Sequence, residues 1–186
     1  MRLAVVIASP YASNSQLPPH GNGQVDQALM AARLAEPDLD REVVTLDAGR
    51  DLPDELDELL ASRGRVDNLI IYFSGYVAVK PDRGPALLLD GSRLKAFPLS
   101  RLRGMVARSA ESAVAILDVV LIPGDGLGPE AVAIALGDSL TRDDARIDAM
   151  VAVRQLAQRR PGTSPFTHLL TIALDHVRDH RAERPV

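Results

Sequence analysis

The sequence predicts an α/β fold in which helices cover both faces of a mostly parallel sheet. Short apolar runs alternate with stretches of helical periodicity along the chain, which is typical of this class. Leu3–Ala8 is apolar throughout, as expected of a strand buried on both faces. The 186 residues are 46% hydrophobic, which is enough to build the core of one domain.

Residue patterns and breakers define the individual elements. Aliphatic residues spaced three and four apart predict helices, and Pro37 and Gly64 end two of them. Pro10–Gly23 is rich in Pro, Gly, Asn and Ser, which predicts a loop. Pro129 could open a short helix in an ambiguous stretch. The predicted strands are Leu3–Ala8, Glu42–Leu46, Val66–Phe73, Ala86–Leu89, Ala113–Val119 and Ala149–Val153, and helices are predicted after Gly23, Asp51, Pro98 and Ser164.

Composition excludes several functional classes. The chain has no cysteine, so it can form neither a disulfide nor a thiolate nucleophile. Its net charge of -4 argues against a general nucleic-acid binder, and no apolar run approaches the ~20 residues that span a membrane. We expect one domain over residues 1–178 and a basic, frayed tail over 179–186. We also expect a cytoplasmic protein with no cofactor and no nucleic-acid or membrane partner.

Two strand ends resemble those of the caspase and metacaspase family. Asn68–Tyr76 reads Asn-Leu-Ile-Ile-Tyr-Phe-Ser-Gly-Tyr and resembles the family strand that ends Tyr-Phe-Ser-Gly-His-Gly. Ala115–Val120 resembles the strand that ends Leu-Asp-Ala-Cys-His-Ser-Gly. The resemblance implies a three-layer caspase-like fold over nearly the whole chain. Weaker matches follow in the family's order at Arg2–Ser9, Leu17–Leu34, Leu87–Asp90, Pro98–Leu102 and Ser164–Leu170.

The resemblance also implies that the catalytic dyad of the family is lost. Tyr76 stands where the family has its histidine, and Val120 stands where it has its cysteine. A phenol with an ordinary pKa near ~10 is not a base at neutral pH, and valine has no nucleophilic atom. We therefore expect a pseudoenzyme that is not a working cysteine peptidase.

Three polar positions match the S1 pocket of family members that cut after Arg or Lys. They are Asp26, Ser74 and Asp118, and two carboxylates in one cleft would favour a guanidinium guest. A plainer interpretation stays open, in which Asp118 only caps a loop and Asp26 is an exposed helix residue. The glycine-rich Gly124–Gly128 lacks the Lys-Ser/Thr of a P-loop, so we interpret it as a loop. His176 and His180 have no evident third metal ligand.

The leading functional hypothesis is a caspase-like pseudoenzyme that acts by binding. It would be a scaffold, a regulatory partner of an active peptidase, or a module of a bacterial defence or signalling system. One alternative is a non-peptidase hydrolase in which Asp26 and Asp118 hold a metal or act as an acid and base. Another is a structural homodimer that extends its sheet through the edge strand Ala149–Val153.

Overall fold

The computed structural model describes residues 1–9, 23–80, 82–89, 95–122, 126–142, 146–155 and 163–182. Most of the predicted loop Pro10–Gly23, the start of the glycine-rich segment and the end of the predicted tail lie outside these residues. Within them the strands are β1 (Arg2–Ala8), β2 (Glu42–Asp47), β3 (Val66–Lys80), β4 (Gly84–Leu89), β5 (Lys95–Pro98), β6 (Ala110–Leu121) and β7 (Ile147–Gln155). The helices are α1 (Gly23–Leu34), the 3-10 turn η1 (Pro37–Leu39), α2 (Leu52–Arg63), α3 (Leu99–Ser109), α4 (Pro129–Thr141) and α5 (Pro165–Ala182).

The strands form one seven-stranded sheet centred on the long strand β3. Its first part runs parallel to β1 on one side and to β6 on the other, and β2 and β7 lie outside these neighbours, also parallel. Parallel strands require crossover connections, and the helices supply them. The predicted mostly parallel sheet is therefore confirmed.

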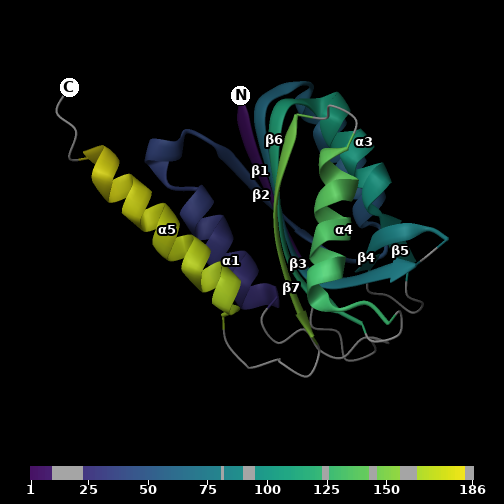
Figure 1. Cartoon of the computed structure of the whole chain (residues 1–186). Coiled ribbons are helices and arrows are strands. Elements are labelled where there is room, and N and C mark those ends of the chain that lie inside the picture. Colours follow the sequence, from purple (N-terminus) through teal and green to yellow (C-terminus); the bar gives the residue numbers. More distant parts are fainter. Residues whose placement is uncertain are drawn as a thin grey trace.

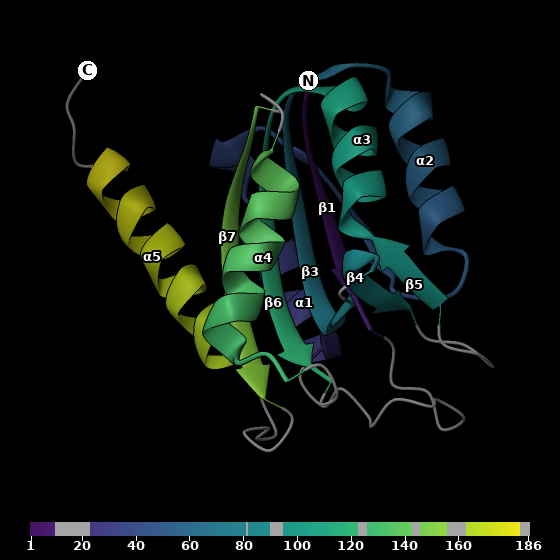
Figure 2. The same ribbon diagram turned by 45° about the vertical axis from the view of Figure 1, so that its right-hand side comes forward.

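Helices cover both faces of the sheet (Figures 1 and 2). Helices α2, α3 and α4 bury aliphatic side chains on the face that carries Val5, Ile71 and Leu117. Helices α1 and α5 pack on the face that carries Val6 and Tyr72. Because successive side chains of a strand alternate between faces, even-numbered residues of β3 and β6 point towards α1 and α5. The predicted three-layer α/β class is confirmed.

The prediction that the third strand ends at Phe73, with a loop after it, is wrong. Strand β3 continues to Lys80, and the antiparallel strand β4 pairs with its second part, Tyr76–Lys80. Strands β1 and β4 thus occupy successive stretches of the same edge of β3, since the β1 pairing ends at Ser74. The short strand β5, which we did not predict, pairs with β4. These pairings satisfy backbone groups that a loop would leave open.

Gly75 lies at the junction between the β1 and β4 pairings. A Cβ atom there would lie 2.5 Å from Ser9 Oγ and 2.7 Å from Cζ of the buried Phe73 ring. Only glycine fits this approach, because the chain leaving β1 crosses directly beside it. Ser74-Gly75 resembles a strand end in sequence, but it lies inside the continuous strand β3. Glycine is required there for packing.

The remaining boundaries follow local chemistry. Gly64 ends α2 with a φ of 64°, a conformation that favours glycine, and Pro129 opens α4 as predicted. Helix α5 runs to Ala182 and so includes the first residues of the predicted tail. Strand β7 pairs with β6 and with no other described strand, so it is the edge that we expected. In the described part of the chain, no helix combines the length and apolar character needed to cross a membrane.

A buried carboxylate cluster and the lost dyad positions

Asp26, Ser74 and Asp118 come together on the face of the sheet that α1 and α5 cover. Ser74 and Asp118 are register partners on β3 and β6, and both point towards this face. Asp26 reaches them from the first turn of α1, and Ser74 Oγ donates a long hydrogen bond of 3.5 Å to Asp26 Oδ2. All three residues are fully buried. The prediction that Asp26 could be an exposed helix residue is therefore wrong.

Asp118 is held by three side chains of its own protein. Arg154, on the neighbouring strand β7, places its Nη2 3.1 Å from Asp118 Oδ1. Thr167 donates from its Oγ1 to Asp118 Oδ2 over 2.8 Å, and the Ser164 hydroxyl donates to the same oxygen. The carboxylate thus has a cation on one oxygen and two hydroxyl donors on the other, which is how a buried charge is stabilised.

The first turn of α5 is attached to both aspartates. The Ser164 backbone N–H donates to Asp26 Oδ1 over 2.9 Å, and Ser164 Oγ accepts the Thr167 N–H over 3.2 Å as a helix cap. Two carboxylates at the positive end of a helix are favoured by its dipole. Asp118 thus accepts the side-chain hydroxyls of the first turn of α5, in place of the loop cap that we considered. We call Asp26, Ser74, Asp118, Arg154, Ser164 and Thr167 the carboxylate cluster.

Tyr72 of β3 forms a hydrogen bond with a member of the carboxylate cluster. Its hydroxyl lies 2.6 Å from Thr167 Oγ1. Thr167 has one hydroxyl proton, and that proton points to Asp118, so Tyr72 is the donor in this pair. Burial, with the negative charge of Asp118 as the next cause, raises the pKa of Tyr72 above its usual range. The phenol therefore stays protonated and keeps donating at any physiological pH.

Arg154 of the chain itself supplies the guanidinium that the S1-pocket hypothesis assigned to a bound substrate. Its side chain is only 14% exposed, and it lies in the apolar strand β7. An arginine at such a position needs a carboxylate partner, because an unpaired buried charge is costly. Its Nε atom is buried and has no hydrogen-bond partner among the described residues. The guanidinium is thus anchored by its Nη2 end.

The carboxyl group of Asp26 is the titratable member of the cluster near neutral pH. Burial is the main cause that raises the pKa of Asp26 to about 6, and the charge of Asp118 adds to it. The Ser164 N–H and the Arg154 charge act in the opposite direction. Protonation of Asp26 at mildly acidic pH relieves the repulsion between the two carboxylates.

The two positions that the sequence resemblance aligns with the caspase dyad lie side by side in an apolar environment. Tyr76 and Val120 are register partners on β3 and β6, and they are 1% and 0% exposed. Leu88 of β4 is the register partner of Tyr76 on its other side, and the three residues form one buried apolar cluster. The predicted strands end at Phe73 and Val119, before these two positions, whereas the structure places both positions inside the longer strands β3 and β6. No thiol is available anywhere in the chain, so it is not a cysteine peptidase.

Sequence reasoning missed Arg154, Ser164, Thr167 and Tyr72 as members of this site. One signal was available, because a single arginine ending an apolar strand predicts a buried ion pair. The Ser164 to Thr167 spacing predicts a helix cap, but not that the cap would face Asp118. In the part of the chain that the structure describes, no three His, Asp or Glu side chains come together. A metal between Asp26 and Asp118 would have to displace Arg154 and both hydroxyls.

Comparisons with known proteins do not assign a family. No protein-family model and no curated protein matches the chain. Among solved structures, the protein GSU0716 from Geobacter sulfurreducens is similar, with a TM-score of 0.47 and 15% identity over 100% of this chain and 67% of that one.

Proposed function

We propose that this chain is a caspase-like pseudoenzyme that acts by binding a protein partner. One observation carries the proposal. The positions that match the family's dyad are Tyr76 and Val120, which lie side by side in a buried apolar cluster with Leu88. A valine in an apolar contact can neither attack a carbonyl nor relay a proton. The segments of β3 and β6 that resemble the family's strand ends then serve to build the domain. Its function lies on its surfaces.

The state of the carboxylate cluster supports surface binding over binding of a basic peptide. Arg154 and two hydroxyls already occupy both oxygens of Asp118. An incoming arginine side chain would have to remove Arg154 from its partner and find room beneath α1 and α5. Such an exchange leaves one guanidinium unpaired and gains no net ion pair.

Exposed apolar side chains on the outer layer favour a protein partner. Leu169 and Ile172 of α5 are 64% and 51% exposed. They are three residues apart and so lie on one side of the helix. Apolar residues grouped on a surface are common where proteins meet. We infer a scaffold or regulatory role, with an active peptidase or a component of a bacterial defence or signalling system as the partner.

The test is calorimetric titration of the purified chain with short peptides that end in Arg, Lys or Asp. We expect no binding heat from any of the three. A matched experiment on Arg154→Ala asks whether the pocket opens once the internal guanidinium is gone. Saturable binding of the Arg or Lys peptide to the unaltered chain, lost in Asp118→Asn, would show that the cluster is a working recognition pocket and would contradict the proposal.

A homodimer through the edge of β7 is a second candidate. The observation that favours it is the edge itself, since β7 pairs with no described strand besides β6. An open strand edge is a template for pairing with a second chain. Met150 is 43% exposed on this strand, whereas Val151 packs towards the core, so Met150→Asp is the better probe. Light scattering that gives the mass of a single chain for both proteins would exclude the dimer.

A further inference from the structure

A second polar site lies at the opposite end of the sheet from the carboxylate cluster. It is an open pocket of about 520 Å³ at the amino ends of β6 and β7, beside the last turns of α3 and α4. This volume lies within the range of small-molecule sites. Nothing in the proposed function uses this pocket.

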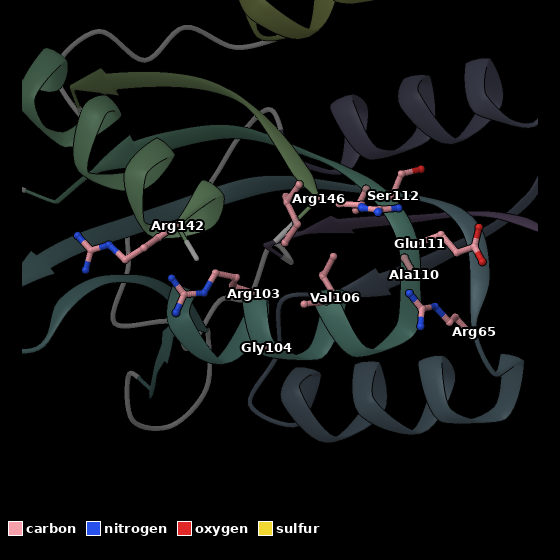
Figure 3. Close-up of a pocket in the computed structure, with 12 residues that line it drawn as sticks. Arg65, Arg103, Gly104, Val106, Ala110, Glu111, Ser112, Arg142 and Arg146 are labelled. Carbon is pink, nitrogen blue, oxygen red and sulfur yellow. The ribbon is translucent and has the colours of Figure 1, made fainter. Parts of the chain in front are cut away.

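Four arginines from separate elements border the pocket (Figure 3). Arg103 belongs to α3, Arg142 directly follows α4, and Arg146 and Arg65 directly precede β7 and β3. Figure 3 shows Arg103 and Arg142 at one end of the pocket, and Arg65 with Glu111 at the other. Among the described residues that line the pocket, Glu111 is the one acidic side chain. Segments far apart in sequence thus place an excess of positive charge around one hollow.

The positive charge around this pocket contrasts with the negative net charge of the whole chain. The chain has a net charge of -4, so four guanidinium groups around one pocket do not follow from a generally basic surface. The carboxyl ends of α3 and α4 attract cations, and Arg103 Nη1 does donate to Ser139 O in the last turn of α4 over 3.2 Å. Each helix end supplies only about half a negative charge, which is less than the arginines carry.

Three of the four arginines, Arg65, Arg142 and Arg146, are exposed, and none of them forms an ion pair within the described part of the chain. Asp143 and Asp144 stand between Arg142 and Arg146 in sequence, outside the described residues. Whether these guanidinium groups hold a ligand is therefore tested by measuring binding, and not by counting charges.

The lining also offers an apolar surface. Val106, Ala110, Ala113 and Ile147 form a small apolar floor, each of them at most 7% exposed. An anion with an uncharged organic part would use both features, because guanidinium forks bind phosphate oxygens in pairs while the aliphatic floor accepts a ring or chain. We propose that this pocket binds a small organic ligand carrying two or more phosphate groups, of the size of a nucleoside diphosphate.

The experiment titrates the full chain with ADP, inorganic pyrophosphate and adenosine at about 0.15 M salt, an ionic strength that screens weak surface attraction. We expect saturable binding of ADP, weaker binding of pyrophosphate and none of adenosine. The double variant Arg142→Ala/Arg146→Ala should weaken ADP binding about ten-fold or more, since it removes two charge-assisted contacts to phosphate.

Arg83→Ala is the matched control, because Arg83 is an exposed arginine on the β3–β4 turn, away from the pocket. It should leave ADP binding unchanged. Absence of ADP binding at millimolar concentration would overturn the proposal. So would equal weakening by Arg83→Ala, which would indicate general charge attraction, or binding of adenosine as strong as that of ADP. Thermal unfolding of each variant, measured alongside, separates loss of binding from loss of folding.

Discussion

Replacing Asp118 with alanine should lower the free energy of unfolding by about 3–5 kcal/mol, the cost of breaking a buried ion pair on one side. Asp118 is fully buried and accepts from Arg154, Ser164 and Thr167. Without it, the Arg154 guanidinium, which is only 14% exposed, has no carboxylate partner. The hydroxyls of Ser164 and Thr167 also lose their acceptor. Since single domains are stable by about 5–15 kcal/mol, the loss is large.

Urea unfolding at pH 7 measures this effect, with Asp54→Ala as the matched control. Asp54 also pairs with an arginine, Arg101, but its side chain is 77% exposed, and exposed pairs contribute about 0–1 kcal/mol. Arg154→Ala combined with Asp118→Ala should cost less than the two single changes added together, because neither partner is then left alone. A cost of Asp118→Ala no greater than that of Asp54→Ala would refute the structural role of the cluster.

The stability of the protein should depend on pH through Asp26. The pKa of Asp26 is raised from an ordinary value of 3.8 to about 6 by burial, so the folded state holds this proton more tightly than the unfolded state does. The resulting stabilisation is fully present below about pH 4 and is lost as the pH rises through about 6. Moving the pKa from 3.8 to about 6 corresponds to a loss of about 3 kcal/mol.

Asp26→Asn isolates this contribution. The asparagine carbonyl can still accept the Ser164 N–H, and its amide can donate to Ser74 Oγ. We expect the variant to match the unaltered protein near pH 4 and to be more stable by about 2–3 kcal/mol at pH 7.5, since it carries no charge to bury. The two unfolding curves are compared across pH 4–8. A difference that stays constant, or that grows towards low pH, would contradict the assignment.

The sequence predicts most of this fold because its signals are local. The strands, the helix boundary at Gly64 and the opening of α4 at Pro129 all follow from period, glycine and proline. The extension of β3 beyond Phe73 was missed although Tyr76-Val77-Ala78-Val79 is typical of a strand. The resemblance of Ser74-Gly75 to a strand end led to the wrong boundary, whereas the structure continues the strand through pairing with β4 and the close approach of Ser9 to Gly75.

The candidate site was likewise only partly predictable from the sequence. Residue-by-residue resemblance located Asp26, Ser74 and Asp118, and the structure brings them together. It gave no information on what fills the space between them. Arg154 and Thr167 are distant in sequence from Asp118, and only the packing of β7 and α5 against the sheet places them there. An occupied cluster and an open pocket are thus indistinguishable in sequence.

The most direct test of the central claim follows the Arg154 guanidinium by NMR while a peptide ending in arginine is added. The Arg154 Nε–H signal is assigned by its absence in Arg154→Lys. If the cluster is closed by its own arginine and the protein acts through its surfaces, this signal should stay in place at saturating, millimolar peptide. A signal that moves in proportion to bound peptide would show that an external arginine displaces Arg154, and that the buried carboxylates form a functioning recognition pocket.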